Sequence, residues 1–161
     1  MADVDLQPRE EKEAMLYAED LAEGQQFQLG EYTISEAEIL QFARQYDPVP
    51  IHTDPEAAAA GPFGGLIASG FNTIAIYQRL IVEAVWSKVA AIVGRSIEVR
   101  LPAPVRPGTR LTGRSEIQKI TLRPERRDAV AIFKTELTNT EGKVVLILVL
   151  DALIRLRPEK T

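Results

Sequence analysis

The sequence predicts an α+β fold, in which an antiparallel sheet wraps around one long central helix. Residues 70–90 are apolar around most of the helical circumference, which is typical of a buried helix. The chain after this helix alternates between strand-like segments and short breaks that contain proline, glycine or asparagine. The four expected strands are residues 92–101, 109–121, 129–139 and 143–156. Because long strands with short connections pair antiparallel, we expect them to form one sheet that covers the helix.

The first strand and the first helix are predicted before the central helix. Residues 26–34 alternate weakly between apolar and polar side chains and predict a strand. Ser35 and Glu38 have the spacing of a capping box, which begins a helix over residues 36–46. Pro48 lacks a backbone donor and disfavours helical geometry in the preceding residue, so this helix must end there.

A loop and a short helix should follow. Residues 47–52 hold two prolines and are expected to form a stiff loop. Thr53 or Asp54 can cap a helix that begins at Pro55 and ends near Ala60. The glycine-rich residues 61–65 lack the lysine of a phosphate-binding loop, and a turn into the central helix is the better interpretation.

Length and composition limit the possible functions. The chain of 161 residues is expected to be a single domain over 1–161, with residues 1–14 a flexible charged terminus. A net charge of −4 argues against nucleic-acid binding. The chain has no cysteine and one histidine, so no metal and no other cofactor is expected. No secretory or membrane-spanning segment is found in the sequence, which favours a cytoplasmic location.

Asp47 and His52 are the candidate catalytic residues. His52 is the only histidine and follows Asp47 by five residues, directly after the first helix. A carboxylate and a neutral imidazole on one stiff loop can act on the same water, one taking a proton while the other orients the molecule. A pair of this kind indicates a hydratase or a hydrolase. A structural role is the alternative, since a lone histidine is often only a hydrogen-bonded core residue and Asp-Pro often opens a turn.

Three blocks of residues resemble the MaoC-like dehydratases, which include the (R)-specific enoyl-CoA hydratases. Residues 47–54 (DPVPIHTD) are similar to the hydratase motif D-x-N-P-x-H-x-D. Residues 65–70 (GLIASG) are similar to the family's G-x-I-A-H-G segment, and residues 104–108 (PVRPG) to its P-V-x-x-G-D turn. The chain departs from these patterns at Val49, Ser69 and Thr109, which replace an asparagine, a histidine and an aspartate.

The resemblance implies a hot dog fold and an enzyme that acts on acyl-CoA. Asp47 and His52 would then activate water for addition to the 2,3-double bond, or receive it in the reverse dehydration, with an (R)-3-hydroxyacyl thioester as the hydrated species. The backbone amide of Gly70 would polarise the thioester carbonyl, a role that also suits the free N–H groups at the start of a helix. A close contact between the helix and the sheet is the structural alternative for Gly70.

Two other functions and an assembly state remain to be considered. A hot dog thioesterase would direct water at the thioester carbon, and a non-catalytic acyl-binding subunit would use Asp47 and His52 only for structure. The resemblance implies a homodimer or a higher homo-oligomer, and a curled sheet with an unpaired edge strand favours the same assembly.

Three arginines are candidates to bind the phosphates of CoA, although none is assigned as a ligand: Arg95, Arg100 and Arg106.

Overall fold

The computed structural model describes residues 14–159 and contains one curled antiparallel sheet. The strand order is β1-β4-β5-β6-β3, and β2 pairs with β4 beside β1. All strand pairs are antiparallel, as expected from the short connections between them. The strands are β1 (Gln26–Gln28), β2 (Tyr32–Thr33), β3 (Ala91–Arg100), β4 (Arg110–Arg123), β5 (Asp128–Thr138) and β6 (Val144–Arg155).

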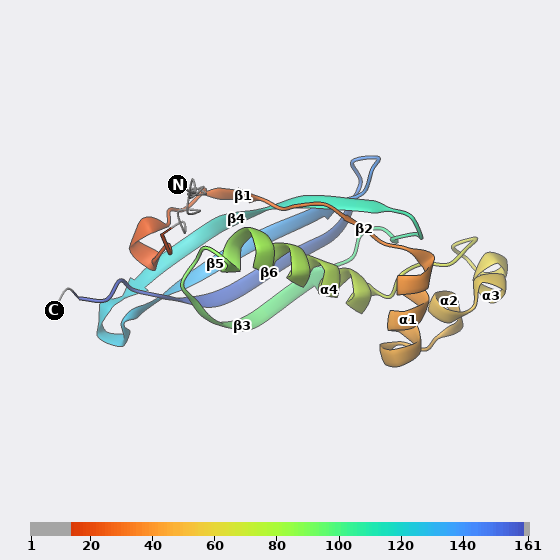
Figure 1. Cartoon of the computed structure of the whole chain (residues 1–161), viewed down its shortest axis with the longest axis horizontal. Coiled ribbons are helices and arrows are strands. Elements are labelled where there is room, and N and C mark those ends of the chain that lie inside the picture. Colours follow the sequence, from red (N-terminus) through yellow and green to blue (C-terminus); the bar gives the residue numbers. More distant parts are fainter. Residues whose placement is uncertain (1–13, 160–161) are drawn as a thin grey trace, which may run out of the picture.

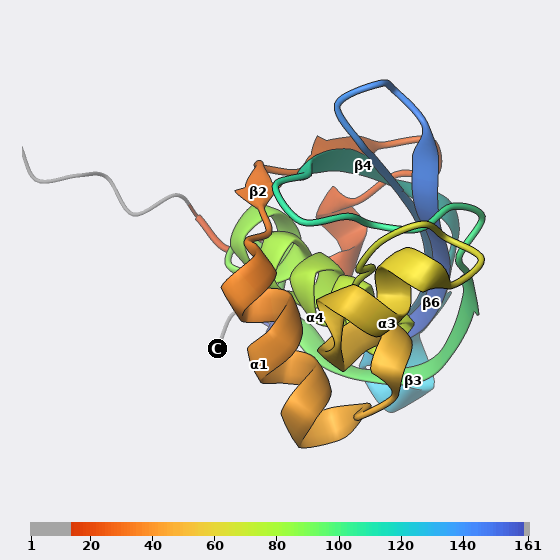
Figure 2. The same cartoon turned by 90° about the vertical axis from the view of Figure 1, so that its right-hand side faces the viewer.

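The helices form two groups, one inside the curl of the sheet and one at its end. The long helix α4 (Gly70–Ile81) lies lengthwise along the sheet, and three shorter helices gather beyond its N-terminal end (Figure 1). Seen from that end, the strands curve around α4 (Figure 2). This is the expected hot dog arrangement. The shorter helices are α1 (Glu36–Tyr46), α2 (Pro50–Thr53) and α3 (Pro55–Ala60), and the single turns are η1 (Ala18–Asp20), η2 (Val82–Trp86) and η3 (Pro124–Arg126).

The core lies between α4 and the concave face of the sheet. Ile76, Leu80 and Ile81 on α4 are almost completely buried, as are Phe133 on β5 and Leu148 on β6. Along β5 buried side chains alternate with partly exposed ones, so the period of two places one set of residues against the helix. Each such apolar side chain contributes about 1.5 to 3 kcal/mol through removal from water, which makes this contact the main source of stability.

Two expected elements differ in detail. The regular part of the central helix ends at Ile81 and continues as a π-helical turn to Trp86, instead of running to residue 90. In this turn Ser87 N bonds to Val82 O at 2.9 Å, and the Trp86 ring packs edge-on against Phe133 at 5.1 Å between centroids. The spacing of apolar residues in the sequence does not distinguish a π-helical last turn from an α-helical one.

The expected strand over residues 26–34 is divided into β1 and β2. Leu29, between them, is 3% exposed, and its N–H still reaches Gly113 O at 2.9 Å. The chain therefore stays beside β4 but does not follow a continuous ladder.

The expectation of a helix buried on nearly all sides is wrong for α4. Phe71 on α4 is 68% exposed, and Val82 at the start of η2 is 41% exposed, because one curled sheet covers only one side of a helix. The edge strand β3 carries exposed apolar side chains as well, including Val93 (51%) and Ile97 (56%). The described residues therefore leave apolar surface open on α4 and along the sheet edge.

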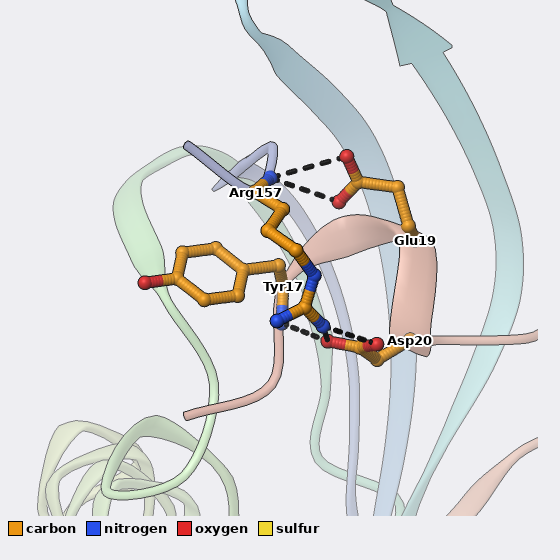
Figure 3. Close-up of polar contacts among 4 residues, drawn as sticks. All are labelled: Tyr17, Glu19, Asp20 and Arg157. Carbon is orange, nitrogen blue, oxygen red and sulfur yellow. Dashed lines mark hydrogen bonds and ion pairs between the residues drawn. The ribbon is translucent and has the colours of Figure 1, made fainter. Parts of the chain in front are cut away.

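A polar clamp joins the two ends of the described chain (Figure 3). The Glu19 carboxylate accepts from Arg157 N at 3.0 Å, and the Asp20 carboxylate accepts from the Arg157 guanidinium at 2.6 Å. The guanidinium also lies over the Tyr17 ring, 5.0 Å from its centroid. The segment after β6 is thus fixed to η1. The expected flexible terminus at residues 1–14 lies, apart from Ala14, outside the described residues.

We expect this clamp to weaken in acid. The backbone N–H of Tyr17 and the Arg157 guanidinium lower the pKa of Asp20 below its ordinary value of 3.8. A carboxylate with a lowered pKa stabilises the fold above its unfolded-state pKa, and this contribution is lost as the pH falls through the folded-state pKa. Asp20→Asn should reduce the loss of melting temperature between pH 5 and pH 2. Glu125→Gln, at another exposed turn, is the control, and equal acid sensitivity of Asp20→Asn and the wild type would contradict the prediction.

Candidate functional site

The helix α1 positions Asp47 at its C-terminal end. Ser35 caps the helix as expected, with its Oγ accepting from Glu38 N at 3.1 Å. The Tyr32 hydroxyl donates to the same glutamate, which lowers the pKa of Glu38 and raises that of Tyr32. The helix ends at Tyr46, and the Asp47 N–H makes the last bond, to Ala43 O at 2.8 Å. The capping box and Pro48 therefore define both ends of the element that carries Asp47.

His52 lies on the short helix α2 and not in an open loop. Its Nδ1 lies 2.8 Å from Ile67 O. Because a carbonyl oxygen can only accept, the Nδ1 must donate, and the neutral ring then has a free lone pair on Nε2. Nε2 lies 3.6 Å from Asp47 Oδ2. The His52 side chain is 13% exposed and that of Asp47 is 28% exposed, so water can reach both groups.

Ser69 is the direct hydrogen-bond partner of Asp47. Its Oγ donates to Asp47 Oδ2 at 2.6 Å, and the residue is fully buried. Ser69 is also the N-cap of α4, where its Oγ accepts from Phe71 N at 3.2 Å. The Asp47 carboxylate is therefore attached to the start of the central helix.

A pocket of about 330 Å³ brings together two of the three sequence-predicted site residues. His52 and Gly70 both line it, whereas Asp47 is not a lining residue and lies beside His52. The Gly70 N–H has no hydrogen-bond partner among residues 14–159. The other lining side chains are mostly apolar: Phe63, Ile67, Ala68, Thr73, Leu101, Pro102, Ala103, Pro104 and Val105. The volume and lining suit a small apolar group with one polar end.

The glycine-rich turn and the arginines have structural contacts. Residues 61–65 form a turn before α4, and Arg106 donates to Phe63 O at 2.7 Å, which holds the turn against the segment between β3 and β4. Arg95 pairs with Asp151 at 2.7 Å, and Arg100 lies 3.7 Å from a carboxylate oxygen of Glu98. None of these contacts identifies a phosphate ligand.

Neither a metal cluster nor a membrane span is found in the part of the chain that the structure describes. No three histidine, aspartate or glutamate side chains lie close enough together there to hold a metal ion. No helix within residues 14–159 has the length and apolar character needed to cross a bilayer.

The fold and the site together define a class, the hot dog proteins with an aspartate and a histidine beside a largely apolar pocket. Comparison with known families gives the particular member of this class. The MaoC like domain family matches residues 20–139, and the chain belongs to this family. The matched range includes α1, the Asp47 and His52 segment, and all of α4.

Solved structures and curated proteins agree with this assignment. A MaoC-like dehydratase from Rhodospirillum rubrum is 35% identical and superposes with a TM-score of 0.84, over 89% of this chain and 99% of that chain. An R-hydratase from Pseudomonas aeruginosa has the same fold, with a TM-score of 0.68 at 22% identity over 88% of this chain and 86% of that one. The 3-hydroxyacyl-thioester dehydratase Z of Mycobacterium tuberculosis is 44% identical over 91 residues, which is 53% of this chain and 58% of that protein. The chain spans about half the length of the curated relatives it matches, from 43% to 60%.

Sequence reasoning missed two contacts of the site. The Ser-Gly pair at the start of a helix predicts a cap, but nothing in the sequence indicates that the serine also binds Asp47. The bond between His52 and Ile67 O is a contact across 15 positions to a backbone atom, which no residue type reveals. Both contacts depend on how α1 and α2 pack against the start of α4.

We expect Gly70→Ala to strain the pocket wall. A Cβ at residue 70 would lie 2.4 Å from Leu101 Cδ1, so the leucine must move. Overpacking of this kind costs about 1 to 3 kcal/mol. Because the atom that must move is at the end of an exposed leucine side chain, we expect a cost near the lower limit of this range. The melting temperature of the Gly70→Ala variant should fall. Adding Leu101→Ala removes the contact and should recover part of that loss, and if the double variant lost stability additively the close approach would not be the reason for glycine here.

Proposed function

We propose that this protein is a hydratase or dehydratase of acyl thioesters that uses Asp47 and His52. One observation carries the proposal: Asp47 Oδ2 and His52 Nε2 are both acceptors, 3.6 Å apart, beside the unpartnered Gly70 N–H. Two acceptors cannot bond to one another, but each can accept one hydrogen of the same water molecule. Membership of the MaoC-like family supports this reading of the pair.

The chemistry follows from this arrangement. The oxygen of the held water attacks C3 of a 2,3-unsaturated thioester while one of the two acceptors removes a proton from it. Negative charge then moves to the thioester oxygen, giving an enolate. When the enolate collapses, the proton is returned to C2, so the water is divided into a hydroxyl on C3 and a hydrogen on C2. Dehydration is the same sequence in reverse.

The Gly70 N–H is suited to stabilise the enolate oxygen. It is the first amide of α4 and carries the partial positive charge of a helix N-terminus. A donor that is already oriented needs no rearrangement when the charge develops, which makes such groups effective in catalysis. A Cβ at residue 70 would lie 2.4 Å from Leu101 Cδ1, so only glycine lets this side chain of the pocket wall lie so close to the amide.

The proposed substrates are trans-2-enoyl-CoA thioesters in the cytoplasm, with (R)-3-hydroxyacyl products. The similarity to a 3-hydroxyacyl-thioester dehydratase supports the substrate class. A panel of trans-2-enoyl-CoAs of different chain lengths, assayed by loss of the enoyl absorbance, tests it, and chiral analysis of the product tests the configuration. Release of free CoA would instead indicate the thioesterase. Binding of the panel without turnover would indicate the acyl-binding subunit.

Asp47 and His52 should behave as one unit. Asp47→Asn and His52→Ala should each reduce kcat by about 10² to 10⁴-fold, because general acid–base groups contribute this much, and the double variant should lose little more. Glu56→Gln is the matched control, since Glu56 is exposed on the neighbouring helix α3, and this variant should keep normal turnover. Losses that multiply in the double variant would show that the two groups act independently, contrary to the mechanism.

We further propose that the protein assembles as a homodimer through β3 and α4. The strand β3 is at the edge of the sheet, so one side of it has no strand partner among the described residues. Its exposed apolar side chains and those of α4 would be buried if two copies paired their edge strands. The open face of α4 is then explained by a second copy of the chain.

A charge on β3 should therefore prevent this assembly. Ile97→Lys, at 56% exposure, should give a monomer by light scattering at micromolar concentration, because a buried ammonium group in the interface has no partner. Leu122→Lys, at 47% exposure near the far end of β4, is the control and should leave the mass unchanged. A wild-type monomer, or an Ile97→Lys variant that still dimerises, would be the opposite result.

A further inference from the structure

The Ser69 hydroxyl has two partners, which together determine its orientation. The Phe71 N–H donates to Oγ at 3.2 Å, and the proton on Oγ points to Asp47 Oδ2 at 2.6 Å. A carboxylate oxygen accepts, so the serine is the donor in the second bond. The residue is 0% exposed, so no water competes for this proton.

We propose that Ser69 is a positioning residue that holds the Asp47 carboxylate in the orientation required for water activation. This inference rests on the proposed hydratase function and assigns to Ser69 a role that acts through Asp47. Ser69 is 0% exposed, whereas the Asp47 side chain is 28% exposed, so the hydroxyl reaches the site through Asp47. Its effect should therefore appear in the rate of the chemical step and not in substrate binding.

The place of Asp47 in the fold explains why such a donor is needed. Asp47 is the C-cap of α1, where the partial negative charge of the helix end disfavours a carboxylate. Within residues 14–159, Ser69 is the one side chain that donates a hydrogen bond to Asp47. The imidazole of His52 offers a lone pair and not a proton on the side that faces Oδ2, because its Nδ1 proton is held by Ile67 O. Without Ser69 the carboxylate would be free to turn away from Nε2.

Ser69 also connects the two parts of the site. It caps α4, and the next residue is Gly70, whose N–H is proposed to bind the enolate oxygen. The distance between the water-activating carboxylate and this amide therefore depends on one buried residue. A serine that served only as a helix cap would require the bond to Phe71 N but not the bond to Asp47.

Substitutions at Ser69 separate these roles. Ser69→Gly removes the hydroxyl but keeps a residue that is tolerated as an N-cap, whereas Ser69→Ala removes both hydroxyl and cap. Both variants should reduce kcat for a trans-2-enoyl-CoA by roughly 10 to 100-fold, since displacement of a reacting group by about 1 Å can cost about 100-fold. KM should change less than about threefold.

Two further variants serve as controls. Ser69→Thr retains the hydroxyl and should recover most of the rate relative to Ser69→Gly. Ser115→Ala removes another fully buried serine hydroxyl, which accepts from Thr135 Oγ1 at 2.9 Å between β4 and β5, and should leave both kcat and KM unchanged. Circular dichroism and thermal melting establish that each variant is folded.

A double-mutant cycle with Asp47→Asn decides the question. If Ser69 acts through Asp47, Ser69→Gly should have little further effect on kcat in the Asp47→Asn background. Losses that multiply, or a Ser69→Gly variant with normal kcat, would overturn the inference while the proposed function stands. Absence of hydration by the wild-type protein would overturn both.

Discussion

The contact between α4 and the concave face of the sheet is the interaction on which the rest of the structure depends. It buries Phe133, Leu80 and Ile81, which are among the largest fully buried side chains of the described residues, and fixes where the first turn of the helix lies. The segments that build the site converge on that turn: α1 and α2 reach it through Asp47 and His52, and residues 101–105 cross it on the way from β3 to β4. A shift of α4 along the sheet would change the position of each of these groups.

Local features of the sequence predicted the elements that carry the site. The capping box at Ser35, the proline at 48 and the cap at Asp54 each act within four residues, and the structure has all three. The strands after α4 were also predictable, to within two residues at each end, because alternation and breaks are local signals. The π-helical turn, the exposed side of α4 and the partner of Ser69 were not, since each depends on residues far apart in the sequence.

The departures from the family pattern have physical explanations in this chain. Val49 makes no side-chain cap for α2, but Pro50 at the first helical position and the bond from Thr53 Oγ1 to Val49 O stabilise the turn instead. Thr109 acts through its backbone, which accepts from Ile34 N at 3.1 Å and joins the chain before α1 to the start of β4. Ser69 occupies the position of a second imidazole with a smaller group that is always able to donate. With these departures in place, Asp47 Oδ2 and His52 Nε2 lie 3.6 Å apart.

The pocket is built from two separate parts of the sequence. The groups proposed to perform the chemistry lie within residues 47–70, whereas the opposite wall consists of five consecutive residues, 101–105, in the connection between two strands. Leu101 is 47% exposed and lines the pocket, and Val105 O, in the same connection, accepts from Ala68 N at 2.8 Å, beside Ser69. In the proposed mechanism, the reacting groups and one wall of the acyl pocket therefore come from different segments of the chain. Under the proposed function, residues 101–105 are therefore the first place to change the range of substrates while Asp47, His52 and Ser69 are kept.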